Sequence, residues 1–427
     1  MARSRILLFA TIMVCLILGC VEGLARLTYF IIYKQGYDAN RMHAVVRRNN
    51  YGISDEFVAW WDEEIIHPYL GYVIDFKDAK RNNDSYGFLT SKSPVIKREP
   101  GKLNVLILGG SVAQSMRLCL EAAFSRACRE PPNVVSLGMA GYKQPQQLMA
   151  LSYFLSLGAE YDLVVNLDGF NEIALPFTDN CKVGINPFFP RNWNLRIGRQ
   201  PSKAILAKIG EVRYLRDLKE QSLERVKSNP FRWSACYGLA KMEEFKRLDR
   251  EITLNSVKLL LLEQKESKTF EETGPLSNYQ DPQQVYRDSA ALWARCSELM
   301  DEAARANGTE YYHFLQPNQY VKGSKVLTWE ERQKAYLEMY DYSKSAIAGY
   351  PMLIEQGKRL VEKHISFVDA TMAFAQEKQT VYVDVCCHYN DLGKELLARF
   401  MLDRITQNPR LRKFFKDAPT TTTATQP

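Results

Sequence analysis

Four short blocks of this chain supply the residue types that perform acyl transfer. They are Leu108-Gly109-Gly110-Ser111, Gly138-Met139-Ala140-Gly141, Gly169-Phe170-Asn171-Glu172, and Asp384 to His388. A serine hydroxyl becomes a nucleophile when a histidine takes its proton, and backbone or amide N–H groups stabilise the oxyanion that then forms. The four blocks therefore predict a nucleophile, two oxyanion donors and a base.

The first three blocks each follow a predicted buried strand. The apolar runs Leu103–Leu108, Val134–Leu137 and Asp162–Leu167 are bounded by turn residues, and helix-compatible stretches at Gln114–Cys128 and Pro145–Leu157 separate them. This βαβα alternation predicts a parallel sheet with helices on both faces. Sites in such sheets form at the carboxyl ends of the strands, which is where the three blocks fall.

The alternation stops between residues 176 and 285 and then resumes. Prolines punctuate the first part of this segment, and Ser202–Leu262 is charged and largely helical in pattern, which predicts a helical insertion. After it we expect helices at Asp288–Asn307, Thr328–Tyr342, Met352–Lys363 and Gly393–Phe400, and strands at Glu310–Leu315 and Ser366–Val368.

The order and spacing of the four blocks resemble the SGNH (GDSL-like) hydrolase superfamily. The resemblance implies a three-layer, flavodoxin-like α/β fold with a central parallel sheet, in two parts at residues 101–175 and 286–415. The chain departs from the family pattern at two positions. Gly110 replaces the aspartate of the Gly-Asp-Ser block, and the position three residues before the histidine, where the family has its acid, is Val385.

The family pattern implies the role of each site residue. Ser111 is the nucleophile, His388 the base, and the oxyanion donors are the N–H groups of Ser111 and Gly141 and the side chain of Asn171. Asp384, four residues before His388, is our choice of acid, while an acid elsewhere or a Ser-His dyad stays open. Taken singly, Gly141 reads as a turn glycine and Asn171 as a helix cap. The other histidines read as structural or surface residues: His43, His67, His313 and His364.

The N-terminus reads as a membrane anchor. A basic Met1–Arg5 precedes Ile6–Val21, which is apolar apart from Thr11 and spans about 24 Å as a helix, slightly less than a bilayer core of about 30 Å. Glu22 and Arg26 follow as an i,i+4 pair, and an apolar, aromatic stretch continues to Tyr33. We expect a single-pass signal anchor in a bacterial inner membrane with the rest of the chain outside; a cleaved signal peptide, or a lipoprotein anchored at Cys20, are the alternatives.

The remaining segments are expected to support the catalytic domain. Residues 1–33 form the anchor and 34–100 an arm packed on the catalytic domain; the arm contains His67-Pro68-Tyr69-Leu70-Gly71-Tyr72, a stretch common in membrane-anchored proteins similar to the superfamily. Residues 176–285 form the insertion, and the low-complexity tail 416–427 is expected to be disordered. Within the insertion, Phe231, Arg232, Trp233 and Tyr237 are expected to pack as core, with a substrate groove as the alternative.

Composition restricts the partners and cofactors. The net charge of +7 over 427 residues is modest, and the basic residues are not gathered in an arginine-rich arm. Nucleic-acid binding is therefore not expected. The cysteines match no zinc spacing, although Cys119 and Cys128 could form a local disulfide or remain free thiols. The resemblance implies no metal and no organic cofactor.

The expected function is hydrolysis of an ester, and the expected substrate is an O-acetyl group on an envelope or exopolysaccharide carbohydrate. Two alternatives remain on the same fold. The first is a polysaccharide O-acyltransferase with a membrane acyl-donor partner, and the second is a non-catalytic carbohydrate-binding or assembly protein. The displaced acid at Asp384 is the feature that keeps the non-catalytic alternative open.

Overall fold

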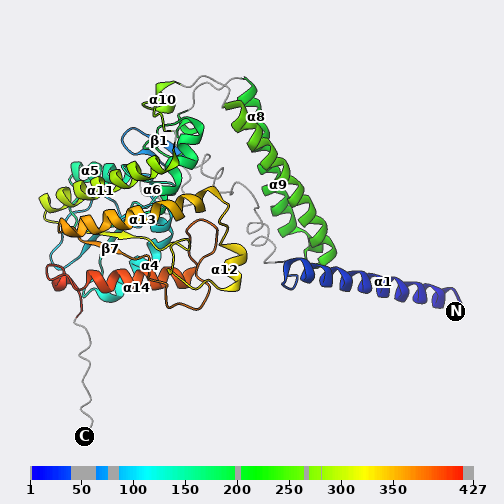
Figure 1. Ribbon diagram of the computed structural model, residues 1–427. Helices are drawn as coiled ribbons and strands as arrows, with labels where there is room; N and C mark the ends of the chain where they lie inside the picture. The colour runs from blue at the N-terminus through cyan, green and yellow to red at the C-terminus, as the bar shows by residue number, and fades with distance from the viewer. Residues whose placement is uncertain are drawn as a thin grey trace, which may run out of the picture. The chain divides into compact units, whose positions relative to one another are not determined.

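The computed structural model describes residues 2–39, 64–75, 86–197, 203–263, 269–279 and 281–416. These residues belong to two compact units (Figure 1). The larger unit comprises Glu63–Ile197 and Lys268–Pro427, and the smaller comprises Met1–Asp62 and Gly198–Ser267. His43, Trp60-Trp61 and the tail from residue 417 lie outside the described residues.

A five-stranded parallel sheet forms the centre of the larger unit, as predicted. Its order is β4-β3-β5-β6-β7, and every neighbouring pair is parallel. All residues of β3 and β5, two of the three inner strands, are buried, as expected of strands covered on both faces. The strands are β3 (Asn104–Gly109), β4 (Asn133–Ser136), β5 (Leu163–Asp168), β6 (Glu310–Leu315) and β7 (Phe367–Asp369).

Helices cover both faces of this sheet, giving three layers (Figure 1). On one face α4 (Ser111–Ala127) packs against α14 (Asp391–Ile405). On the other face α11 (Pro282–Ala306) packs against α5 (Gln146–Ser156), α6 (Phe170–Leu175) and α13 (Asp341–Glu362). The predicted α/β architecture with a central parallel sheet is therefore confirmed.

The helix expected at Thr328–Tyr342 is wrong in its extent. The structure has a short α12 (Trp329–Lys334), a loop, and then α13, which begins at Asp341 and continues through Pro351. Side chains of the loop after β6 form hydrogen bonds with backbone groups that would pair with each other in a continuous helix. Gln319 Nε2 donates to the carbonyl of Ala335, and the N–H of Leu337 donates to Tyr320 Oη. This tertiary contact outweighs the local helical pattern.

The predicted arm contains an antiparallel hairpin of β1 (Glu64–His67) and β2 (Gly71–Ile74). The turn between them is fixed by His67, whose Nδ1 accepts the N–H groups of Tyr69 and Leu70. Tyr72 is fully buried, and its hydroxyl donates to the carbonyl of Ala140 at 2.8 Å. The hairpin therefore packs against the loop that carries Gly141.

Two long helices form half of the segment 176–285 predicted as a helical insertion. They are α8 (Lys203–Ser228) and α9 (Ala235–Glu263), joined by a short 3₁₀ turn, η3 (Pro230–Trp233). With α1 (Ala2–Tyr33) they make up the smaller unit, whose hydrophobic cluster is separate from the main core. The smaller unit takes only residues 198–267 of the predicted 176–285.

The segment between α6 and α8 belongs instead to the larger unit. It continues α6 with a π-helical turn, η1, and then a 3₁₀ turn, η2, before a loop and the short α7. The remaining short elements of the larger unit are α10 and a 3₁₀ turn, η4. Their bounds are η1 (Pro176–Asn180), η2 (Cys181–Val183), α7 (Trp193–Arg196), α10 (Phe270–Thr273) and η4 (Arg412–Phe414).

The possible disulfide between Cys119 and Cys128 is wrong, because both are free thiols. Cys119 lies within α4 and Cys128 directly follows that helix. Nine residues along one helix separate two Cα atoms by about 13 Å, well beyond the roughly 4.4–6.8 Å that a disulfide allows. The alternative expectation, free thiols, is the correct one for this pair.

Candidate active site

Ser111 stands at the junction of a strand and a helix. β3 ends at Gly109, Gly110 is the N-cap of α4, and Ser111 is the first residue of that helix. Gly109 has a φ of +146°, and a Cβ there would lie 2.1 Å from the carbonyl oxygen of Leu167 on β5. Glycine is therefore required for the tight turn that brings Ser111 to the carboxyl end of the sheet.

His388 and Asp384 complete a hydrogen-bonded chain with Ser111. His388 Nε2 lies 2.7 Å from Ser111 Oγ, and its Nδ1 lies 2.5 Å from Asp384 Oδ2. Serine and histidine are 277 residues apart in sequence, so only the fold brings them together. The structure thus places all three residues of the predicted triad in the order nucleophile, base, acid.

The four-residue spacing between Asp384 and His388 is accommodated by a compact turn. Asp384 Oδ1 accepts the backbone N–H groups of Cys386, Cys387 and His388 at 2.9, 3.0 and 3.3 Å. Its other oxygen is thereby directed to the imidazole. The geometry therefore corresponds to the choice of Asp384, with a turn that spans four residues instead of three.

Burial opposes ionisation of Asp384, but its environment overcomes that effect. The charge of His388, the hydrogen bond to His388 and the backbone N–H donors lower the pKa of Asp384 to about 2. An ionised carboxylate is what holds an imidazole in the tautomer that can accept a serine proton. The side chain of His388 keeps 16% of its surface exposed, so the imidazole is reachable from solvent.

The loop after β6 supports this turn, a role that the sequence analysis missed. Asn318 Nδ2 donates to the carbonyl of Cys386, Gln319 Nε2 to that of Asp384, and Tyr320 Oη to that of Val385. Three successive polar residues, which begin three positions after the end of β6, were the available signal. The three carbonyls that these donors bind could not be deduced from the sequence.

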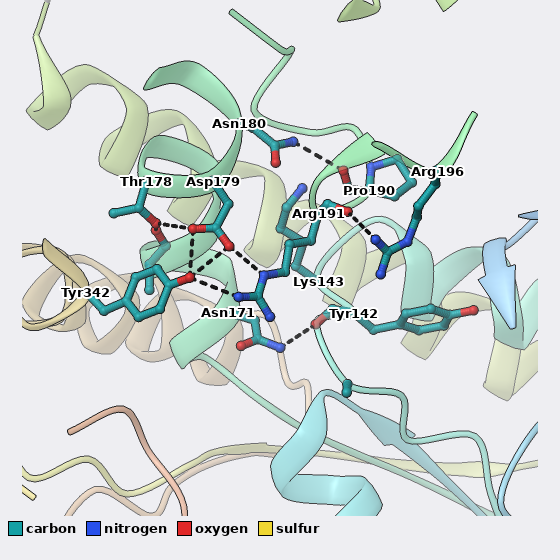
Figure 2. Close-up of polar contacts among 12 residues, drawn as sticks. Tyr142, Lys143, Asn171, Thr178, Asp179, Asn180, Pro190, Arg191, Arg196 and Tyr342 are labelled. Carbon is teal, nitrogen blue, oxygen red and sulfur yellow. Dashed lines mark hydrogen bonds and ion pairs between the residues drawn. The ribbon is translucent and has the colours of Figure 1, made fainter. Parts of the chain in front are cut away.

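Asn171 lies beside the serine turn, at the start of α6. Its Nδ2 donates to the carbonyl of Tyr142 at 2.8 Å (Figure 2), and a Cβ on Gly110 would lie 2.3 Å from the same nitrogen. An amide nitrogen carries two hydrogens, and the contact with Tyr142 uses one of them. The amide of Asn171 thus occupies the space that a side chain at residue 110 would need.

Gly141 lies in the loop after β4, next to Tyr142. Its φ is +76°, and a Cβ would lie 2.9 Å from Tyr72 Oη and 3.0 Å from Arg191 Cδ. Both the left-handed backbone and the crowding favour glycine here. The structure therefore gathers the Gly141 loop, Asn171 and the N-terminus of α4 at one edge of the sheet.

A buried ion pair stands behind this loop and was not anticipated from the sequence. Arg191 Nε binds Asp179 Oδ2 at 2.5 Å, and its Nη2 lies 2.9 Å from Tyr342 Oη, which in turn donates to Asp179 (Figure 2). The neighbouring Lys143 donates to the carbonyls of Pro187 and Phe189, and burial lowers the pKa of Lys143 to about 7. These residues come from separate segments and form no motif.

A second Ser-His-Asp arrangement lies inside the core. His313 Nε2 is 2.7 Å from Asp168 Oδ1, and His313 Nδ1 is 2.8 Å from Ser297 Oγ. Asp168 also accepts from Trp293 and Asn166. His313 and Ser297 have no exposed surface and Asp168 has 1%, so His313 is a core histidine on β6, as predicted.

One group of side chains near the site has a spacing that would admit a metal ion. The side-chain donor atoms of Cys386, Cys387 and His388 lie within 4.8 Å of one another. Metals bind the thiolate, however, and burial raises the pKa of the Cys386 thiol well above its usual range. His388 is already hydrogen-bonded to both Ser111 and Asp384, so the arrangement favours proton transfer over metal binding.

Comparison with known proteins yields structural likeness only. No protein-family model and no curated protein matches the chain. The chain is similar to a GDSL-like lipase from Bacteroides thetaiotaomicron, with 9% identity and a TM-score of 0.35 over 73% of this chain and 91% of that one. It is also similar to a lipase from a goat rumen metagenome, with 8% identity and a TM-score of 0.35 over 71% and 97% of the two chains. At these values the likeness carries no argument about activity.

Proposed function

We propose that this protein is a membrane-anchored serine esterase of the SGNH type. The observation that carries the proposal is the continuous hydrogen-bonded chain from Ser111 Oγ through the imidazole of His388 to Asp384, at 2.7 and 2.5 Å. These three hydrogen-bonded residues lie at the carboxyl edge of a parallel sheet, where sites of α/β proteins form. The serine and the histidine are partly exposed, as a substrate requires.

In the proposed reaction Ser111 Oγ attacks the acyl carbonyl while His388 Nε2 takes the hydroxyl proton. The tetrahedral intermediate collapses, the ester C–O bond breaks, and His388 returns the proton to the leaving alcohol. Water then attacks the acyl-serine, again giving a proton to His388, and the acid leaves as Ser111 is regenerated. Asp384 stays ionised throughout and stabilises the imidazolium.

The oxyanion of each intermediate is held, in this proposal, by the N–H groups of Ser111 and Gly141 and by Asn171 Nδ2. Two observations support it. Asn171 Nδ2 binds the carbonyl of Tyr142, which fixes the amide beside the Gly141 loop, and the same nitrogen closely approaches Gly110. Fixed donors of this kind stabilise a developing charge without reorganisation.

The anchor and the substrate class form the second half of the proposal. Within the described residues one helix is long and apolar enough to cross a membrane, at Phe9–Tyr33, and the basic residues that precede it favour an inside N-terminus. The site would then face outward from the bacterial inner membrane, where O-acetylated envelope or exopolysaccharide carbohydrates are the esters within reach. Lipidation at Cys20 is an alternative anchor that intact-protein mass would reveal.

The proposal is tested by looking for the acyl-enzyme. The full chain in detergent is mixed with p-nitrophenyl acetate and quenched with acid, and peptides are analysed by mass spectrometry. We expect a 42-dalton acetyl increment on the peptide that contains Ser111, and none in Ser111→Ala. If wild type forms no acetyl-serine and releases acetate no faster than Ser111→Ala, the esterase is refuted and the binding role is favoured.

The same experiment separates hydrolysis from transfer. If acetate appears in water alone, and added acceptor sugars do not change its rate, the enzyme is a hydrolase. If the acetyl-serine persists until an O-acceptor carbohydrate is added, the O-acyltransferase alternative replaces the esterase.

A further inference from the structure

The turn between α8 and α9 exposes two large aromatic side chains. Phe231 is 69% exposed and Trp233 is 53% exposed, so the expectation that this cluster packs as core is wrong for both. Tyr237 alone of the expected set packs against the hydrophobic cluster of the smaller unit. Burying two such side chains in an apolar environment would stabilise the protein, because each presents a large apolar surface to water.

This turn is fixed to α1 by a carboxylate. Glu22 Oε1 accepts the N–H of Ala235 at 2.7 Å, and its Oε2 accepts Ser234 Oγ at 2.7 Å. An anion at this place satisfies the unpaired N–H groups at the start of α9 and interacts favourably with the positive end of its dipole. Arg26 binds both Glu22 and the carbonyl of Trp233, each at 3.0 Å.

A small apolar cluster holds the same elements together. Tyr29 of α1 is 1% exposed and packs with Leu223 and Val226 of α8 and with Met242 and Phe245 of α9. Beyond α1, Tyr37 Oη donates to the carbonyl of Arg232 at 2.5 Å. The position of the turn along α1 is therefore fixed beside Glu22 to Tyr29, and Tyr37 adds a further contact after the helix.

The charges on α1 indicate where that level lies in a bilayer. Ile6–Val21 provides about 24 Å of apolar helix. Charged side chains in the hydrocarbon core are costly, so Glu22 and Arg26 belong at its outer boundary. On its exposed face α1 remains apolar beyond Arg26, with Leu27, Phe30 and Ile31 each more than half exposed, which suits the headgroup region.

We propose that the α8–α9 turn is a second membrane contact, in which Phe231 and Trp233 enter the outer interface beside α1. The inference rests on the proposed anchoring, since it takes its depth from the position of α1. The charges near the turn suit a lipid surface: residues 224–233 contain Arg225, Lys227 and Arg232 against one carboxylate, Glu224. The guanidinium of Arg232 lies over the Trp233 ring at 4.7 Å. When Trp233 enters the interface, this cation is therefore placed where it can bind lipid phosphates.

Two contacts with one bilayer have a mechanical consequence. A single helix leaves an attached unit free to rotate about the membrane normal and to tilt. A second contact, fixed to the first through Glu22, Arg26 and Tyr29, sets the tilt of the α8–α9 hairpin relative to the membrane surface. The hairpin then projects outward in a defined direction.

The test measures the depth of Trp233 in the full chain. The protein is reconstituted into vesicles of phosphatidylethanolamine with a minority of phosphatidylglycerol, with or without lipids brominated near the glycerol end of the acyl chain. The difference in fluorescence between wild type and Trp233→Phe isolates the Trp233 signal. We expect bromine to quench that signal at least twice as strongly as it quenches a control tryptophan.

The control places the tryptophan elsewhere on the same hairpin. Tyr214 is 66% exposed on α8 and lies 14 residues before Ser228, about 21 Å along the helix from the turn. The signal of Tyr214→Trp in the Trp233→Phe background, isolated by subtracting that of Trp233→Phe alone, should be quenched by bromine less than half as strongly as the Trp233 signal. Phe231→Ser should make the quenching of Trp233 weaker without releasing the protein.

The outcomes distinguish this inference from the anchoring on which it rests. Extraction of the full chain by alkaline carbonate contradicts the anchor, and the inference falls with it. Retention of the chain in the bilayer with an unquenched Trp233 leaves the anchor standing and overturns the second contact.

Discussion

Among the described residues, two Ser-His-Asp arrangements have hydrogen bonds of nearly the same length. In one, Ser111, His388 and Asp384 are joined at 2.7 and 2.5 Å. In the other, Ser297, His313 and Asp168 are joined at 2.8 and 2.7 Å. The first stands at the carboxyl edge of the sheet and is partly exposed, whereas the second is sealed in the core.

The two arrangements differ in the ring nitrogen that binds the serine, Nε2 of His388 and Nδ1 of His313, and in the surroundings of each serine. Ser111 begins a helix and has the amide of Asn171 and the Gly141 loop nearby, so a reacting carbonyl would meet donors for its oxygen. Ser297 lies in the middle of α11, and Asp168 uses its oxygens to bind Trp293 and Asn166 as well as His313. Hydrogen-bond lengths alone therefore do not identify a catalytic triad; access and oxyanion donors do.

Replacing each serine gives the sharpest contrast. Ser111→Ala should lower kcat for p-nitrophenyl acetate by about 10⁴-fold or more, because the nucleophile is lost. Ser297→Ala should leave kcat per folded molecule unchanged and cost about 1–3 kcal/mol of stability, because the buried hydrogen bonds of its hydroxyl to His313 Nδ1 and Tyr311 Oη are lost. Equal turnover in wild type and Ser111→Ala, measured on matched folded fractions, refutes the assignment.

The two aspartates should differ in the same way. Asp384→Asn should lower kcat by about 10³–10⁴-fold with little change in KM, because the amide cannot stabilise the imidazolium. The comparison is made by initial rates against substrate concentration. A loss of less than about tenfold would favour a Ser-His dyad, in which Asp384 only shapes the turn.

Asn171→Ala should reduce kcat by about 10²–10³-fold, the usual cost of losing one oxyanion donor. Gly169, not Asn171, is the N-cap of α6, so the alternative is a structural role through the bond to the Tyr142 carbonyl, which would lower stability and leave kcat alone. Thermal unfolding together with rates on the folded fraction separates the two. Asn166→Ala is the control, since Asn166 is buried and binds Asp168 instead.

The core arrangement should matter for stability. His313→Ala should lower the free energy of unfolding by about 3 kcal/mol, because Asp168 loses a partner inside the core. Urea titration followed by circular dichroism measures the change, and esterase rate per folded molecule should be retained. Loss of rate without loss of stability would mean that the core network acts on catalysis.

The smallest expected effect concerns pH. The pKa of Asp384 is lowered to about 2, so its contribution to stability is complete above the ordinary aspartate range near 4 and is lost only as pH falls through about 2. The acid limb of kcat/KM should therefore show one ionisation, that of the histidine base. A second ionisation between about pH 3 and 5 would mean that Asp384 titrates normally.

The parts of this site that sequence could predict are those fixed by neighbouring residues. Ser111, Gly141 and Asn171 each follow an apolar strand within a few residues, so the parallel sheet and the position of its edge determine where they lie. His388 followed from its block. The choice of Asp384 rested on proximity in sequence, and the turn that justifies it depends on Asn318, Gln319 and Tyr320.

What sequence could not predict are contacts between distant segments with no local pattern. The Asp179–Arg191–Tyr342 cluster joins three segments, and the core partners of His313 lie on a different strand and on a helix. Phe231 and Trp233 look like core residues by type, yet α1 rather than a core determines their position. The end of α12 is likewise set by side chains from another loop.

The separation of Ser111 from His388 also has a consequence in time. Chains grow at about 5–20 residues per second, so 277 residues correspond to roughly 15–55 s between synthesis of the two residues. His313 is made 75 residues earlier than His388, which lets the core network close first. Ser111 therefore cannot form its hydrogen bond with His388 until after the residues of the core network have been synthesised.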